Sequence, residues 1–168
     1  MNTKNPMRVI KIEKVLLSSG ATGDDLKKAK KLLDFVSGRK AQILTSSKRI
    51  PEFDVRPGLE VGTRVTLRGK EAISLLKRLL GAIDNELNKK QVSDNHFSFG
   101  IKEYIEIPGI EYQRDIGIRG FNTTVVFLRA GSRVKLKKIK RGKVPKKQHI
   151  PKEEIMDYMK EVFKTKFK

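Results

Sequence analysis

The stretch of sequence that decides the fold is Gly62-Thr63-Arg64-Val65-Thr66-Leu67-Arg68-Gly69. Its side chains alternate with a period of two, which is the pattern of a half-buried β-strand. The odd-numbered side chains would lie on a face that can be buried, and the even-numbered ones on a face with two guanidinium groups around the Thr66 hydroxyl. Such groups hydrogen-bond phosphates and ribose hydroxyls, so this face is a candidate RNA surface. The alternative is a half-solvated strand with ordinary charges outward.

The whole chain predicts one α+β domain with a basic extension. Its 168 residues suffice for a single core and leave room for a terminal segment. We expect a mixed, mostly antiparallel sheet with helices packed on one face and the other face open for RNA. The expected domain covers residues 1–132, with an extended arm at residues 1–8. The extension covers residues 133–168 and ends in a short helix.

Composition argues against several classes of protein. The chain has no cysteine, and its two histidines, His96 and His149, lie far apart in the sequence. We therefore expect no disulfide, no structural zinc and no other metal or cofactor. The sequence contains no apolar run long enough to span a membrane, and its first residues do not resemble a secretory leader. A cytoplasmic protein without a membrane partner is expected.

Charge is the strongest compositional signal. The chain carries 38 Lys+Arg against 19 Asp+Glu, a formal net charge of +19. Self-repulsion of this size favours a polyanionic partner such as a nucleic acid. More than half of the excess lies in residues 133–168, whereas residues 84–128 are nearly neutral. This distribution favours docking by particular faces over a uniform coating of charge.

Helical patterns occur in two segments of the first half. Residues 24–37 begin with two aspartates, carry apolar residues at helical spacing and precede Gly38, which suits a C-terminal cap. Residues 70–88 carry the broadest apolar stripe of the chain, so every apolar residue there is expected in the core. Gly81 within this stripe suggests close packing against another element.

Strand patterns surround these helices. Residues 9–17 predict a strand with an irregularity near Glu13, where the parity of the apolar residues shifts. Residues 39–45 predict a second strand. Residues 97–100 and 104–107 predict extended segments whose aromatic residues lie in the core. Residues 123–128 predict an interior strand.

Residues 46–58 predict a long loop or hairpin stiffened by two prolines. Loops of this length in compact domains are often functional. The segment carries Lys48, Arg49 and Arg56, which suit an RNA contact. A surface connection whose charges only aid solubility is the alternative.

The basic extension divides into a charged tract and a helix. Residues 133–147 contain nine Lys/Arg and no acid, a composition that usually orders on a polyanion. Pro151 suits the first turn of a helix, and the apolar residues that follow it define an amphipathic face. This helix is expected to dock on the domain or on a neighbour, with membrane association as the weaker alternative.

Several segments together resemble the universal large-subunit ribosomal protein L-five family in its archaeal and eukaryotic form. They are Asn5-Pro6-Met7-Arg8, Ile12-Glu13-Lys14-Val15, Phe53-Asp54-Val55-Arg56, Val65-Thr66-Leu67-Arg68-Gly69, Phe97-Ser98-Phe99-Gly100-Ile101, Ile116-Gly117-Ile118 and Lys152-Glu153-Glu154. The resemblance implies a structural constituent of the large subunit of the cytoplasmic ribosome that binds 5S rRNA in the central protuberance. It also implies contacts with 23S-type rRNA, a neighbouring 5S rRNA-binding ribosomal protein, P-site tRNA and a small-subunit head protein.

The resemblance also implies site residues. It implicates Ser18, Arg39 and Thr66 in 5S rRNA contact, although relatives often carry asparagine at the first position and usually glutamine at the second. The full predicted rRNA set is Asn5, Met7, Arg8, Ser18, Arg39, Lys40, Arg64, Thr66 and Arg68. The predicted tRNA loop carries Ser47, Lys48, Arg49, Ile50 and Arg56. The predicted RNA contacts of the basic tract are Arg133, Lys135, Lys137, Lys138, Lys140 and Arg141.

Two other functions can be weighed against structural RNA binding. An RNA-processing enzyme is disfavoured, because the carboxylates are scattered among lysines and the Ile116–Gly120 segment lacks the lysine and hydroxyl of a phosphate loop. A free RNA chaperone or membrane-surface adaptor would bind mainly through the tail and without RNA preference.

Overall fold

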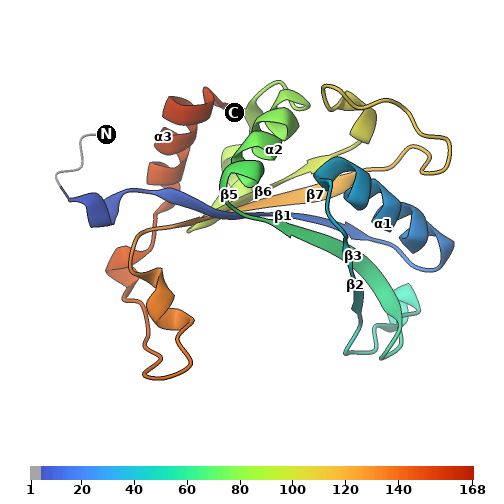
Figure 1. Ribbon diagram of the computed structural model, residues 1–168, viewed down its shortest axis with the longest axis horizontal. Helices are drawn as coiled ribbons and strands as arrows, with labels where there is room; N and C mark the ends of the chain where they lie inside the picture. Colours follow the sequence, from blue (N-terminus) through green and yellow to red (C-terminus); the bar gives the residue numbers. More distant parts are fainter. Residues whose placement is uncertain (1–4) are drawn as a thin grey trace.

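The computed structural model describes residues 5–168 and has an α+β architecture (Figure 1). Six strands form one antiparallel sheet. They are β1 (Lys11–Gly20), β2 (Gln42–Thr45), β3 (Glu60–Leu67), β5 (Val92–Ser93), β6 (His96–Ile101) and β7 (Phe121–Leu128). Their order across the sheet is β2-β3-β1-β7-β6-β5, so the first strand lies in the middle. The expected interior position of the strand at residues 123–128 is confirmed, because β7 lies between β1 and β6.

Within residues 5–168, three α-helices cover one face of this sheet and no α-helix covers the opposite face, as Figure 1 shows. They are α1 (Asp24–Ser37), α2 (Gly69–Gly81) and α3 (Lys152–Phe163). A small parallel sheet joins β4 (Glu86–Leu87) to β8 (Lys166–Phe167). Short 3-10 turns lie at Pro6–Arg8, Pro51–Phe53, Lys89–Gln91, Tyr104–Glu106, Ser132–Lys135 and Lys146–Gln148. The predicted fold class, with helices on one side only, is confirmed.

The alternation in β3 produces the division between the two faces. Thr63, Val65 and Leu67 are buried against the helices, whereas Arg64 is exposed on the opposite side. The strand is shorter than expected at one end, because Arg68 is the N-cap of α2 and Gly69 begins that helix. The irregularity predicted in β1 is confirmed by a register shift between Ile12 and Lys14 in its pairing with β7.

One apolar core joins the sheet to all three helices. The inner side chains of β1, β3, β6 and β7 pack against the buried stripes of α1 and α2. The C-terminal helix shares this core through Ile155, Met159 and Phe163, and Ile150 just before the helix also belongs to the core. Docking of this helix on the domain, one of the two expected arrangements, is therefore what the structure shows. The division at residue 132 stays a prediction.

The long helix predicted over residues 70–88 is wrong at its C-terminal end. It stops at Gly81, and Asp84 and Asn85 follow with left-handed φ angles of 52° and 57°. Ile73 is 39% exposed, so the expectation that every apolar residue of the stripe is core was also wrong. Gly81 packs against Pro108, as expected, although an added Cβ would make an ordinary contact at 3.4 Å from Pro108 Cγ.

Three other local expectations differ from the structure. The segment predicted as extended at residues 104–107 forms a 3-10 turn at Tyr104–Glu106, although Tyr104 is buried as expected. The arm is not extended throughout, because Pro6–Arg8 forms a 3-10 turn capped by the Asn5 side chain. Residues 1–4 of the predicted arm lie outside the described residues. The strand expected at residues 39–45 begins only at Gln42.

Candidate nucleic-acid interface

The face of the sheet that no helix covers, here called the open face, carries polar side chains in rows across the strands. Ser18 of β1 lies directly opposite Arg64 of β3 in the antiparallel register. Gln42 of β2 continues the row on one side of Arg64, and Asn122 of β7 continues it on the other side of Ser18. Directly opposed residues on neighbouring strands share a face of the sheet. The first row therefore combines a guanidinium, a hydroxyl and two amides.

Two further rows extend this surface. Thr66 lies opposite Leu16, and Thr124 and Ser98 continue that row across β7 and β6. The third row contains Lys14, Val126 and His96. No residue in the three rows is acidic. The open face thus offers hydrogen-bond donors and positive charge, as the alternation in β3 predicted.

Not all of the predicted rRNA residues lie on the open face. Ser18, Arg64 and Thr66 are brought together there, the first two as direct cross-strand neighbours. Arg68 lies beyond the end of β3 but keeps an extended backbone, with φ −138° and ψ 161°, and is exposed. Arg39 lies between α1 and β2, where its guanidinium pairs with the carboxylate of Glu71 in α2 at 2.6 Å. This ion pair directs Arg39 toward the N-terminal end of α2.

Residues 46–58, here called the hairpin, form a locally closed structure. The amide of Gly58 donates to the Ser46 carbonyl at 2.8 Å, and Ile50 and Val55 exchange backbone hydrogen bonds nearer the tip. Asp54 turns the chain with a left-handed φ of 51°. The members of the predicted tRNA loop are exposed; they are Ser47, Lys48, Arg49, Ile50 and Arg56. Phe53, which was not among them, is 73% exposed at the turn.

Residues 133–147, here called the basic excursion, leave β7 and return to the core before α3. The return point is Ile150, which is fully buried and exchanges two hydrogen bonds with Asn95 at 2.9 and 3.0 Å. Within the excursion, the amide of Gly142 donates to the Val134 carbonyl at 3.2 Å. The predicted RNA contacts here are all exposed; they are Arg133, Lys135, Lys137, Lys138, Lys140 and Arg141.

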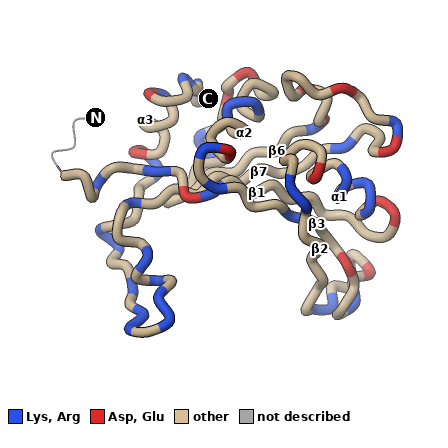
Figure 2. The backbone as a smooth tube through the Cα atoms, viewed as in Figure 1, with Lys and Arg blue, Asp and Glu red and all other residues tan. Residues whose placement is uncertain are grey.

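The hairpin and the basic excursion project on the same side of the sheet, away from the helices. In Figure 1 they extend from opposite ends of the sheet, with the open face between them. Figure 2 shows Lys and Arg along both projections. A long anionic ligand on the open face would therefore meet Lys and Arg side chains at both ends, with the larger excess of positive charge at the basic excursion. This arrangement suits the irregular backbone of folded RNA more than a small molecule.

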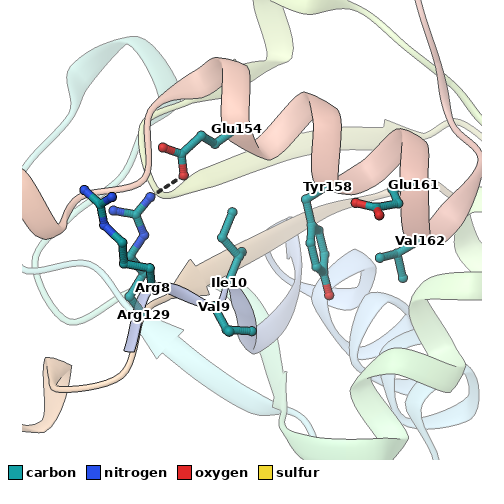
Figure 3. A pocket seen from close by; sticks show the side chains of 8 residues that line it. All are labelled: Arg8, Val9, Ile10, Arg129, Glu154, Tyr158, Glu161 and Val162. Atoms are coloured by element: carbon teal, nitrogen blue, oxygen red, sulfur yellow. Dashed lines mark hydrogen bonds and ion pairs between the residues drawn. The ribbon is translucent and has the colours of Figure 1, made fainter. Parts of the chain in front are cut away.

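Arg8, Val9 and Ile10 lie beside α3 and line a pocket of about 500 Å³ (Figure 3). Arg8 and Arg129 lie at one end of this pocket, and the Tyr158 ring lies toward the other. Arg129 pairs with the carboxylate of Glu154, which connects β7 to α3. Burial raises the pKa of the Tyr158 hydroxyl above its ordinary value. Arg8, Asn5 and Met7 are exposed, so the arm remains accessible to a partner.

Some open-face residues were missed by the site prediction. They are Lys14, Gln42, His96, Ser98, Asn122 and Thr124. A signal was present, because the segments around Phe97 and Val125 alternate in the same way as β3. Their side of the sheet could be inferred from that pattern. Their row partners could not, because the pattern carries no register.

These features define a class of protein: an α+β nucleic-acid-binding protein with a half-covered sheet. Within residues 5–168, no group of three or more His, Asp or Glu side chains is arranged to hold a metal ion. Among the helices in this described part of the chain, none is long and apolar enough to cross a membrane.

Comparison with known proteins gives the family. Residues 60–157 match the model for the C-terminus of the ribosomal L-five family. The large ribosomal subunit protein uL5 of Nanoarchaeum equitans is 40% identical over 161 residues, covering 94% of this chain and 95% of that protein. The uL5 protein of Sulfurisphaera tokodaii is 36% identical, and the match covers 96% of this chain and 93% of that protein. The uL5 protein of Pyrobaculum aerophilum is 37% identical, and the match covers 94% of this chain and 90% of that protein. The chain belongs to the ribosomal L-five family, archaeal type, and is a structural protein of the large ribosomal subunit, not an enzyme.

Proposed function

We propose that this structural constituent of the large ribosomal subunit binds 5S rRNA in the central protuberance through its open face. The arm and the basic excursion neutralise neighbouring RNA backbone, including 23S-type rRNA. The protein also contacts a neighbouring 5S rRNA-binding protein. The hairpin reaches P-site tRNA, and the same edge of the protein helps to bridge to a protein of the small-subunit head.

One observation carries the 5S rRNA assignment. The register places Ser18 directly opposite Arg64, with Thr66 in the next row, on the face that no helix covers. Ser18 and Thr66 are positions that resemblance to the family implicates in 5S rRNA contact, and Arg64 follows from the alternation in β3. Residues identified by family resemblance and a residue identified by strand alternation therefore lie together on one small area of the sheet. Hydroxyl and guanidinium groups so arranged can contact ribose and phosphate in the shallow groove of folded RNA.

Charge reversal on the open face tests this assignment. Arg64→Glu should weaken 5S rRNA binding at fixed salt by at least about tenfold, because it removes a phosphate contact and adds repulsion. Lys31→Glu is the matched control, since Lys31 is exposed on α1 on the other side of the sheet. It makes the same change in net charge. The binding constants can be measured by filter binding or fluorescence anisotropy.

The Lys31→Glu control distinguishes an effect of the open face from an effect of net charge. Equal losses in the two variants would show that only net charge matters and that the open face is not the binding surface. Unchanged affinity in Arg64→Glu would reject the assignment directly. Both side chains are exposed, so thermal unfolding should confirm that each variant is folded.

A further inference from the structure

The tip of the basic excursion combines charge with exposed apolar side chains. Leu136 and Ile139 are 79% and 78% exposed, more than any other large apolar side chain in residues 5–168. They stand among Lys135, Lys137 and Lys138. A segment that only neutralised phosphates would need no apolar groups at its tip. Exposure of these two side chains therefore requires its own explanation.

The excursion holds this tip through an internal hydrogen bond and through the anchor at its return end. The Gly142–Val134 hydrogen bond closes the segment across Leu136 and Ile139. A Cβ at Gly142 would lie 2.8 Å from Val134 Cγ1, so a larger residue at this position would require the Val134 side chain to shift. At the return end, the Asn95–Ile150 hydrogen bonds fix the chain to the core. Leu136 and Ile139 are therefore presented by a closed segment.

The neighbouring surfaces indicate what lies against this tip. The excursion projects on the side of the open face (Figures 1 and 2). Leu136 also lines a cavity of about 190 Å³ together with Val126 of the third row and Leu128, so this apolar side chain adjoins the open face. The segment carries nine Lys/Arg and no acid. Charge complementarity and continuity with the open face both favour an RNA partner.

The chemistry of RNA narrows the contact further. In a paired A-form helix the bases are stacked and the major groove is too narrow for side chains. Apolar base faces become accessible where nucleotides are unpaired. We propose that Leu136 and Ile139 pack against unpaired bases of an RNA loop or bulge while the surrounding lysines bind its phosphates. This inference rests on the proposed RNA-binding function and adds the class of RNA structure that the excursion binds.

Salt dependence separates the two chemistries. The full-length protein would be titrated with an RNA hairpin that carries an eight-nucleotide unpaired loop and with a fully paired RNA of equal length. Leu136→Ser/Ile139→Ser should bind the looped RNA about three- to tenfold more weakly at every salt concentration, with an unchanged slope of log K against log salt. Lys137→Gln/Lys138→Gln should lower that slope by about 1.4, since each single-strand phosphate contact contributes about 0.7. Neither variant removes a buried side chain.

Three results would overturn the inference. The first is wild-type affinity for the looped RNA in Leu136→Ser/Ile139→Ser. The second is an equal loss on the paired RNA. The third is that Leu136→Ser/Ile139→Ser loses binding to vesicles of phosphatidylserine and phosphatidylcholine but keeps its binding to the looped RNA. That result would assign the apolar tip to a membrane surface. The first two, with normal 5S rRNA binding that remains sensitive to Arg64→Glu, would reject the tip contact and leave the proposed function intact.

Discussion

The hairpin and the basic excursion are both exposed, but they differ in charge and in how they are held. The hairpin carries three basic and two acidic residues, whereas the excursion carries nine basic residues and no acid. The hairpin closes on itself between β2 and β3 through the Gly58–Ser46 and Ile50–Val55 contacts. The return of the excursion depends on Asn95, which is distant in sequence. A nearly neutral, preformed turn suits recognition by shape and stacking, and a cationic segment suits neutralisation of RNA backbone.

The largest expected difference between the two projections is in salt dependence. Replacing Lys135, Lys137, Lys138 and Lys140 with glutamine should lower the slope of log K against log salt for 5S rRNA by about 3, if each lysine meets one phosphate. At about 0.1 M salt that corresponds to a loss of about 10²–10³-fold in affinity. The measurement is a titration at several salt concentrations.

The matched variant lies in the hairpin. Lys48→Gln/Arg49→Gln/Arg56→Gln removes three charges but should lower the slope for 5S rRNA by less than about 1, because the hairpin is assigned to tRNA. Equal changes in slope would mean that the two projections contribute alike to phosphate binding on 5S rRNA. The distinction between them would then be lost.

A second effect, of intermediate size, should distinguish the ligands of the projections. Replacing residues 48–56 by a short Asn-Gly turn should leave 5S rRNA affinity within about twofold of the wild type. Large subunits carrying this variant should bind P-site tRNA about tenfold more weakly, a loss of about 1.4 kcal/mol, because Phe53 and three cations are removed. Reconstituted subunits and a tRNA binding assay would measure this. A large loss of 5S rRNA affinity would contradict the division of roles.

The sequence predicted the faces of the sheet better than its pairing. The alternation at Thr63, Arg64 and Val65 assigned the buried and open sides correctly, because a period of two leaves no other arrangement once one face is covered. The pairing of Ser18 with Arg64 could not be derived in the same way. Register depends on contacts between segments that are far apart in the chain. It was found only in the folded structure.

Errors in the predicted elements share a physical cause. The apolar stripe of α2 continued in the sequence through Ile83 and Leu87, so the helix was extended too far. In the structure, Asp84 and Asn85 have left-handed backbone conformations and turn the chain after the helix. Leu87 is then buried as part of β4 and not of α2. Helical spacing of apolar residues records burial, and burial can continue after the helix ends. The arrangement of the basic excursion was likewise hidden, because its anchor at Asn95 consists of one side-chain and one backbone hydrogen bond to Ile150, and neither has a periodic signal.

The last expected effect is on stability, not on binding, and concerns how each projection is held. Asn95→Gly keeps the left-handed backbone at this position, where φ is 64°, but removes the side-chain oxygen that accepts from the buried Ile150 amide. An amide left buried without a partner costs about 1–3 kcal/mol, so the free energy of unfolding should fall by about that amount. Asn95→Asp retains an acceptor and should stay near the wild type.

Hydrogen exchange would show where this loss is felt. In Asn95→Gly, amides in residues 133–150 should exchange faster because their anchor is weakened, whereas amides in residues 46–58 should be unchanged because their hydrogen bonds are local. Faster exchange in both projections would indicate a general loss of stability. Unchanged exchange in residues 133–150, with normal stability, would show that the excursion is ordered without Asn95. The proposed difference in how the excursion and the hairpin are held would then have no structural basis.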